Sequence, residues 1–191
     1  MDIRRKKPLL SAIVPISRMS GQLKNLEIWL RDSYLKNDLE IILIHDKQDE
    51  ETGIELRDLI KNFSNVIFSE GYFGSPGATR NEGLTKISGN WICFWDSDDL
   101  PQVDVVIERL KRCSDTTEIV IGRFEIFDFQ TSKKKTFIHE SNFEIDSIFE
   151  SPGLWRFVFR SDLIKNIEFP KLRMGEDQVF LSRVGPFGRN F

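Results

Sequence analysis

The stretch WICFWDSDDLP, residues 91–101, indicates both the fold class and the place of the functional site. Its first five residues are apolar and match the length of a buried strand, and an acidic turn, Asp96–Asp99, follows at once. Pro101 then favours the first turn of a helix. A buried strand, a turn and a helix in this order form one βα unit of an α/β protein.

Similar units precede this one. Apolar runs predict strands, and apolar residues at helical spacing predict helices between them, in the order 9–16, 20–34, 40–45, 50–63, 66–69 and 75–87. Ser20 is the expected N-cap of the first helix, and Ser75-Pro76 are the expected N-cap and first residue of the third. A helix after Pro101 and a strand from Val120 continue the series. Repeated βα units predict a mainly parallel sheet with helices on both faces.

The pattern changes after residue 124. We expect a strand over 124–129, a hairpin tip at Lys133–Lys135 and a return strand over 136–139. Trp155–Arg160 is strand-like, Ser161–Ile164 is a helical turn, and a helix begins near Gly175. The sequence therefore predicts one α/β domain over 1–191, with a βα part (1–123) and a mixed C-terminal part (124–191).

The composition excludes several classes of protein. With 40% apolar and 30% charged residues, the chain is neither disordered nor collagen-like. A net charge of −3 and a pI near 5.5 argue against nucleic acid as a partner. Cys93 and Cys113 give no disulfide framework and no zinc spacing, which favours a cytoplasmic location. The basic run Arg4-Arg5-Lys6-Lys7 is interpreted as a solvated tail or, alternatively, as a peripheral contact with the inner face of a membrane.

The acidic turn is the strongest candidate for chemistry. Asp96 and Asp98 are two residues apart at a strand end, so both side chains can face one ligand. With Asp99 they place three carboxylates within four residues, and these repel one another unless a cation lies between them. A divalent cation shared with a substrate diphosphate would supply that charge. The alternative is a solvated turn that caps the following helix.

Three other sets of residues are candidates. Gly74–Leu84 joins glycines to a helix start, which suits an anionic neighbour, and its Arg80 either pairs with a carboxylate near a nucleotide or coats the surface. Asp46 ends the second strand, where it could accept hydrogen bonds from a base or ribose, or cap a helix. Glu176 and Asp177 begin a helix; one could deprotonate a hydroxyl in a cleft, or both could simply favour the helix dipole.

Taken in order, these segments resemble the inverting family 2 glycosyltransferases, which have the GT-A fold, over Leu10 to about Val184. The similarity is greatest to bacterial members that build capsular or surface polysaccharide. The matching segments are Ile13-Val-Pro15, Asp46, Ala78-x-Arg80-Asn-x-Gly-Leu84, Asp96-x-Asp-Asp99, Trp155–Arg160 and Gly175-Glu-Asp177.

The resemblance implies a role for each matching residue. Asp46 would bind the nucleobase, Arg80 would contact the nucleotide side of the donor site, and Asp177 would be the general base. Glu176 would orient Asp177 or meet the acceptor. Asp98 would ligate Mn²⁺ or Mg²⁺, with Asp96 orienting ribose, sugar or metal. The remaining residues implied at the donor site are Pro15, Ser97 and Trp155, the last stacking on a sugar face or packing in the core.

The implied activity is a metal-dependent hexosyl transfer. A sugar would pass from a nucleotide-diphosphate donor, with UDP-sugar favoured, to a hydroxyl of a saccharide or lipid-linked saccharide, with inversion. Only 14 residues follow Asp177, where family members usually continue, so a binding-only or partner-completed remnant is the alternative. A sugar nucleotidyltransferase is a weaker alternative, because Pro15–Gly21 holds one glycine and one arginine where those enzymes have a glycine-rich loop.

Overall fold

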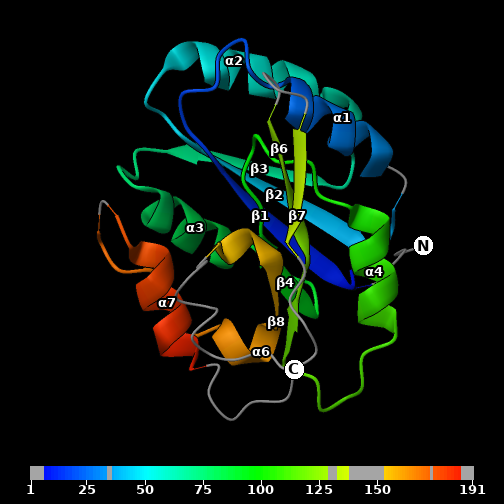
Figure 1. The fold of residues 1–191 in the computed structure, drawn as a ribbon. Helices are drawn as coiled ribbons and strands as arrows, with labels where there is room; N and C mark the ends of the chain where they lie inside the picture. The colour runs from blue at the N-terminus through cyan, green and yellow to red at the C-terminus, as the bar shows by residue number, and fades with distance from the viewer. Residues whose placement is uncertain (1–6, 34–35, 129–132, 138–152, 173, 186–191) are drawn as a thin grey trace, which may run out of the picture.

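The computed structural model describes residues 7–33, 36–128, 133–137, 153–172 and 174–185. Its centre is a six-stranded sheet in the order β3-β2-β1-β4-β8-β5 (Figure 1). The strands are β1 (Leu10–Ile16), β2 (Leu39–Asp46), β3 (Val66–Gly71), β4 (Trp91–Phe94), β5 (Ile119–Ile121) and β8 (Phe157–Arg160). The runs predicted as strands in the first half of the chain all belong to this sheet.

The sheet is mainly parallel, as predicted. Strands β1 to β4 run parallel to one another, whereas β8 lies between β4 and β5 and is antiparallel to both. The insertion of β8 was not predicted, because strand order is not encoded in a local pattern. The expected strand at Trp155–Arg160 begins only at Phe157, because Leu154–Arg156 form a 3₁₀ turn, η2.

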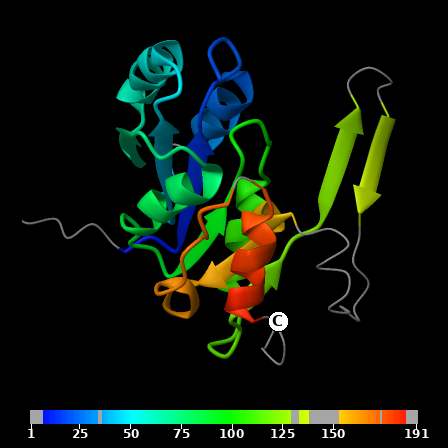
Figure 2. The ribbon, with the colours of Figure 1, turned by 90° about the vertical axis from the view of Figure 1, so that its left-hand side faces the viewer.

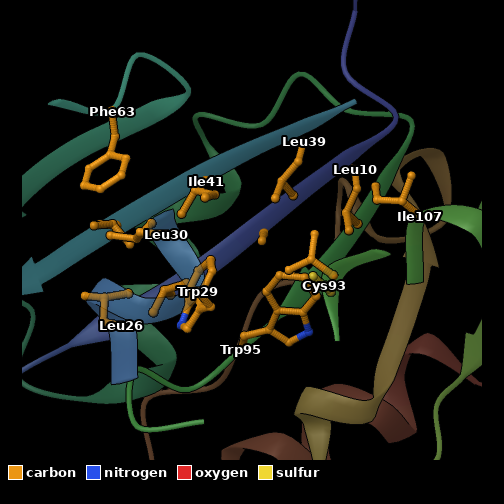
Figure 3. Close-up of a cluster of buried hydrophobic side chains, with 14 of the residues drawn as sticks. Leu10, Leu26, Trp29, Leu30, Leu39, Ile41, Phe63, Cys93, Trp95 and Ile107 are labelled. Carbon is orange, nitrogen blue, oxygen red and sulfur yellow. The ribbon is translucent and has the colours of Figure 1, made fainter. Parts of the chain in front are cut away.

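Helices cover both faces of the sheet. One face carries α1 (Lys24–Ser33), α2 (Glu50–Leu59) with the 3₁₀ turn η1 (Ile60–Asn62), and α4 (Val103–Lys111). Their apolar side chains pack with those of β1, β2 and β4 around Trp29, Cys93 and Trp95 (Figure 3). The other face carries α3 (Pro76–Leu84), α6 (Ser161–Ile164) and α7 (Glu176–Val184), packed around Phe94, Phe159 and Phe180. Every second strand residue points into one cluster and the next into the other, as a sheet buried on both faces requires.

Of the two predicted N-caps, one is confirmed and one is wrong. Ser75 caps α3 by accepting a hydrogen bond from the backbone N–H of Ala78, and Pro76 is the first helical residue. Ser20 is not a cap, because α1 begins at Lys24 and the Ser20 hydroxyl donates to Glu55. Helix α2 is capped by Asp49.

A two-stranded antiparallel ribbon, β6 (Phe124–Asp128) and β7 (Lys133–Phe137), projects beside the main sheet (Figure 2). The prediction of a hairpin tip at Lys133–Lys135 is wrong, because these residues lie in β7 and pair with Ile126–Asp128. The proposed strand residues Phe129 and His139 lie outside the described residues.

The amino ends of the strands are tied together by Glu40. Its carboxylate accepts hydrogen bonds from the Ser88 backbone N–H (2.6 Å), the Ser88 hydroxyl (2.6 Å), the Gly89 backbone N–H (3.1 Å) and the Ser11 hydroxyl. Gly89 is required for this close approach, since a Cβ there would lie 2.5 Å from Ser11 Oγ. This end of the sheet therefore has a structural network, and the opposite end is open for a site.

In the part of the chain that the structure describes, no helix has the length and apolar character needed to cross a membrane. Of the basic run considered as a membrane contact, Arg4, Arg5 and Lys6 lie outside the described residues and Lys7 is exposed.

Candidate active site

The acidic turn lies at the carboxyl end of β4, beside the central strand β1. Trp95 precedes the turn and packs edge-on against Trp29 of α1, with ring centroids 5.7 Å apart. The Asp99 backbone N–H donates to the Asp96 carbonyl (3.2 Å), and the Asn25 side chain of α1 donates to the Asp98 carbonyl (2.8 Å). Ser97 is buried, whereas Asp98 is exposed. The backbone of the turn is therefore held while the Asp98 carboxylate faces solvent.

Arg80 is the centre of the site. Its guanidinium is buried and forms ion pairs with carboxylates from two other parts of the chain. Nη2 lies 3.2 Å from Asp96, and Nη1 lies 2.9 Å from Asp177 and 3.4 Å from Glu176. Of the two alternatives for Arg80, pairing with a carboxylate is the one that the structure shows. A single cation thus joins the acidic turn to the start of α7.

Two glycines bring α3 close enough for Arg80 to make these contacts. A Cβ at Gly83 would lie 2.5 Å from Ile13 Cγ2 of β1, and one at Gly77 would lie 3.0 Å from Phe169 Cβ and 3.2 Å from Glu176 Cγ. Without side chains at these positions, α3 packs directly on the sheet and on the segment that leads to α7. The glycines of the 74–84 segment therefore act through close packing.

Asn81 fixes the segment before α7. Its side chain accepts from the Phe169 backbone N–H (2.8 Å) and donates to the Phe169 carbonyl (3.0 Å). Phe169 then stacks on Phe180 of α7, with ring centroids 4.0 Å apart. Sequence reasoning assigned no role to Asn81 or to Asn25. Asn81 could have been noticed as the polar neighbour of Arg80, but Asn25 has no local signal.

Two carboxylates that face Arg80, Asp177 and Asp96, have raised pKa values. Burial raises the pKa of Asp177 to about 6; the Arg80 charge opposes this rise, while Glu176 and Asp96 add to it by repulsion. Burial also raises the pKa of Asp96, again against Arg80 and with repulsion from Asp98. One guanidinium does not neutralise this many carboxylates, so the site retains excess negative charge. Ionisable groups with perturbed pKa values at a sheet edge are typical of functional sites.

A divalent cation fits this site only together with a ligand. Among the described residues, no three His, Cys, Asp or Glu side chains converge into a cage for a metal ion. Asp96 is engaged by Arg80, and Asp98 is exposed. Mg²⁺ and similar hard cations are usually held by one or two carboxylates plus substrate phosphates, which is the donor set that Asp98 and Asp96 offer.

Pro15, Asp46 and Trp155, also predicted at the donor site, lie in β1, β2 and η2, respectively. Asp46 ends β2, two strands from β4, and Pro15 lies in β1 beyond its last pair with β4, Ile13–Phe94. Trp155 lies in η2, where its ring meets Phe124 edge-on at 4.7 Å, and it packs against the core on the α1 side. The structure thus brings together Arg80, Asp96, Glu176 and Asp177, and it places Asp46 further along the same edge.

Comparison with known proteins identifies the family of the chain. Residues 24–187 match the family model described as Glycosyl transferase family 2. The chain is 24% identical to glycosyltransferase GlyA of Streptococcus pneumoniae and 26% identical to poly(ribitol-phosphate) beta-glucosyltransferase of Bacillus spizizenii. These matches cover 92% and 90% of this chain, respectively, and 28% of each relative. The chain therefore spans less than a third of the length of these relatives.

Solved structures share the fold. TarS 1–349 of S. aureus, in complex with UDP-GlcNAc, superposes with a TM-score of 0.74 at 19% identity over 92% of this chain and 52% of that one. The mannosyltransferase PcManGT of Pyrobaculum calidifontis, in complex with GDP-Man and Mn²⁺, gives 0.68 at 14% identity over 97% of this chain and 54% of that one. Because the family model covers most of the chain, the chain belongs to glycosyl transferase family 2, and its mixed, mainly parallel sheet is that of the GT-A fold.

Proposed function

We propose that this chain carries out metal-dependent transfer of a hexosyl group from a nucleotide-diphosphate sugar to an acceptor hydroxyl, with inversion. The observation that carries the proposal is the set of ion pairs made by Arg80. It joins Asp96 of the acidic turn to Asp177 at the start of α7. This reaction needs a site for the diphosphate and a carboxylate that can take a proton. Here the buried Arg80 guanidinium pairs with the carboxylates proposed for both roles.

Asp177 is the proposed general base. As the acceptor oxygen attacks the anomeric carbon, its proton passes to the Asp177 carboxylate and the bond from that carbon to the diphosphate oxygen breaks. A single displacement from the opposite side inverts the configuration. Glu176 is less exposed than Asp177 and shares Nη1 of Arg80 with it, so we assign Glu176 to orienting the guanidinium and the base.

Asp98 and Asp96 would hold Mn²⁺ or Mg²⁺ together with the donor's diphosphate. When bound, the cation would supply Lewis-acid neutralisation of the charge that develops on the leaving nucleoside diphosphate. The complexes of TarS with UDP-GlcNAc and of PcManGT with GDP-Man and Mn²⁺ support this part of the proposal. Because TarS is solved in complex with UDP-GlcNAc, a UDP-sugar is the donor we favour.

The acceptor and the setting are also proposals. The name poly(ribitol-phosphate) beta-glucosyltransferase, carried by one relative, supports a surface-polymer or lipid-linked saccharide acceptor. Free thiols at Cys93 and Cys113 are consistent with a reducing, cytoplasmic setting. We propose one domain over 1–191, with 1–123 binding the nucleotide-sugar and 124–191 forming the acceptor side, where Asp177 lies.

Donor binding tests the proposal first. UDP, UDP-GlcNAc and GDP-mannose are each added with Mn²⁺ or with EDTA, and the melting temperature is recorded, since a ligand of the native state must raise it. The variants are Asp98→Ala and a matched control, Asp58→Ala, whose exposed carboxylate lies on α2. We expect a Mn²⁺-dependent rise for at least one donor, lost in Asp98→Ala and kept in Asp58→Ala. Equal shifts with Mn²⁺ and with EDTA would refute metal dependence.

Turnover tests the second part of the proposal, which is the transfer reaction with Asp177 as the general base. Release of UDP or GDP from the donor is measured for the wild type and for Asp177→Asn, which removes the base but keeps the shape of the side chain. General-base catalysis contributes about 10²–10⁴-fold, so we expect a loss in that range with donor binding retained. Donor binding without release of nucleoside diphosphate in the wild type would favour the binding-only alternative.

A further inference from the structure

We infer that Tyr72 is the aromatic surface on which the donor's nucleobase stacks, and that Asp46 holds the loop that presents it. The inference rests on the proposed function, because it names the base-binding residue of the same site. It differs from the role that family resemblance implies for Asp46, which is direct contact with the base.

The Asp46 carboxylate is already engaged by the protein. Oδ1 accepts from the Phe73 backbone N–H (2.9 Å) and from the Gln48 side chain (3.2 Å), and Oδ2 accepts from the Gly74 backbone N–H (2.9 Å). The residue is only 5% exposed. Hydrogen bonds from backbone amides to a carboxylate are among the strong ones. Three of the about four acceptor positions of the Asp46 carboxylate are therefore used to hold the loop and its neighbour Gln48.

The same loop is fixed at its other positions. A Cβ at Gly71 would lie 2.8 Å from Phe73 Cζ, so the Phe73 ring lies over the backbone of Gly71. Phe73 also packs against the core on the α3 side. Gly74 adopts φ +77°, and Ser75 immediately caps α3. Because residues 71 and 73–75 are held in this way, the direction in which Tyr72 leaves the backbone is fixed as well.

Tyr72 is the residue of this loop that is left to solvent. Its side chain is 80% exposed, and Lys47 Nζ lies 5.7 Å from its ring centroid. Lys47 is itself 3.5 Å from Glu70 Oε1, so the ammonium is held beside the ring. A large aromatic ring that a fixed loop keeps in water can stack on a ligand without losing much conformational entropy.

The place of Tyr72 on the sheet suits a base. Tyr72 follows β3 and the acidic turn follows β4, three strands away in the order β3-β2-β1-β4. At about 4.8 Å per strand the two lie about 14 Å apart along the edge. A ribose and a phosphate separate the base from the terminal phosphate of a nucleoside diphosphate. A base on Tyr72 therefore leaves the diphosphate directed toward Asp96 and Asp98.

At this part of the edge the described residues hold one other aromatic ring, Phe73, which is less exposed because it packs against the core on the α3 side. The residues directly after β1 are Ser17, Arg18 and Met19, and those directly after β2 are Lys47, Gln48 and Asp49. Base-aromatic stacking is tolerant of base identity because every base has a π-face. The inference therefore makes Tyr72 a residue that sets donor affinity and leaves the choice among bases to other contacts.

Calorimetric titration tests the inference. UDP, GDP and dTDP, and separately inorganic pyrophosphate, are titrated with Mn²⁺ into the wild type, Tyr72→Ala and Tyr72→Phe. Loss of stacking should weaken the nucleoside diphosphate that the wild type binds by about 5- to 150-fold in Tyr72→Ala. Tyr72→Phe, which keeps the ring, should match the wild type. Pyrophosphate affinity should be the same in all three proteins, because it has no base.

A double-mutant cycle with Asp46→Asn tests the role of Asp46. An asparagine cannot accept both backbone N–H groups, so the loop is loosened. If Asp46 acts by presenting Tyr72, the double variant should bind the nucleoside diphosphate no more weakly than Tyr72→Ala alone. If the two losses multiply, Asp46 acts on the base independently and the inference about it is wrong.

The outcomes separate the two proposals. Absence of binding by all three nucleoside diphosphates to the wild type would overturn the proposed function. Normal binding to both the wild type and Tyr72→Ala would overturn only the role of Tyr72. A parallel loss of pyrophosphate affinity in Tyr72→Ala would show a general disturbance of the site, and it would overturn stacking as the explanation.

Discussion

Replacing Arg80 with methionine should destabilise the protein, and more strongly at pH 8 than at pH 5. Methionine keeps an unbranched apolar stem in the space that the arginine occupies. It removes the cation that faces Asp96, Glu176 and Asp177 at 3.2, 3.4 and 2.9 Å. The three carboxylates are then left to repel one another at the edge of the sheet.

The magnitude follows from burial. Removing one partner of a fully buried ion pair costs about 3–5 kcal/mol. Here the Arg80 side chain is 7% exposed, but the Asp96 and Asp177 side chains are 39% and 30% exposed, so solvent screens part of the repulsion. We expect a loss of about 2–3 kcal/mol in the free energy of unfolding at pH 8.

The sign of the pH dependence follows from the raised pKa values. The pKa of Asp177 is about 6 in the folded protein, above the ordinary value of 3.8 for an aspartate, so the folded state binds protons more tightly than the unfolded chain. Stability is then greatest at low pH and declines as pH rises between these values. Removal of Arg80 takes away the charge that opposes the rise in the pKa of Asp177, so Asp177 is largely protonated at pH 5 and the loss should fall to about 1 kcal/mol.

Urea denaturation at pH 5 and pH 8, followed by tryptophan fluorescence, measures both values. The matched control is Arg31→Met, since Arg31 is 68% exposed and pairs with Glu27 on the surface of α1. The control should lose less than about 0.5 kcal/mol at either pH. A loss in Arg80→Met that is equal at the two pH values, or no larger than that of the control, would refute the reasoning.

Three further predictions concern the base and the frame of the site. The value of kcat/KM should rise about tenfold per pH unit below pH 6 and level off above it, because Asp177 must lose its proton to act as a base; a flat profile from pH 5 to 7, at fixed Mn²⁺, would contradict this. Glu40→Ala should lower the free energy of unfolding by about 2–3 kcal/mol, since it leaves the Ser88 backbone N–H and the Ser88 and Ser11 hydroxyls without their acceptor, whereas Glu108→Ala, 58% exposed, should change it by less than about 0.5 kcal/mol in the same urea titration. Gly83→Ala should cost about 1–3 kcal/mol despite the better helix propensity of alanine, because the new methyl group would lie 2.5 Å from Ile13 Cγ2; an unchanged melting temperature would show that α3 moves away without cost.

Much of the sheet could be predicted because its strands are buried on both faces. The run of β4 is apolar throughout and that of β2 is apolar from Ile41 to Ile44, and capping at Ser75-Pro76 follows from local chemistry. The position of β8 could not be predicted, since an antiparallel strand of four residues between β4 and β5 depends on packing of distant segments. The error at Lys133–Lys135 has a similar cause, because a polar run forms a strand wherever its partner strand fixes the register.

The candidate site could be predicted in its residue types and only partly in its geometry. Asp96, Asp98, Arg80 and Asp177 were identified from their position after strands or at helix starts. Nothing in the sequence showed that one guanidinium would pair with both Asp96 and Asp177, since these residues are 81 positions apart. Nor did the sequence show that Asp46 binds two backbone amides, because such contacts depend on how the next strand ends.

The position of β8 also has a consequence for the chain during its synthesis. Strand β4 ends at Phe94, but the strand that covers its outer edge begins at Phe157, which leaves the ribosome 63 residues later. At about 5–20 residues per second, the nascent chain carries an open, apolar β4 edge for about 3–13 s. Exposed strand edges pair readily with other chains. Nascent chains arrested before residue 157 should therefore bind chaperones or aggregate, whereas those that have released β8 should not.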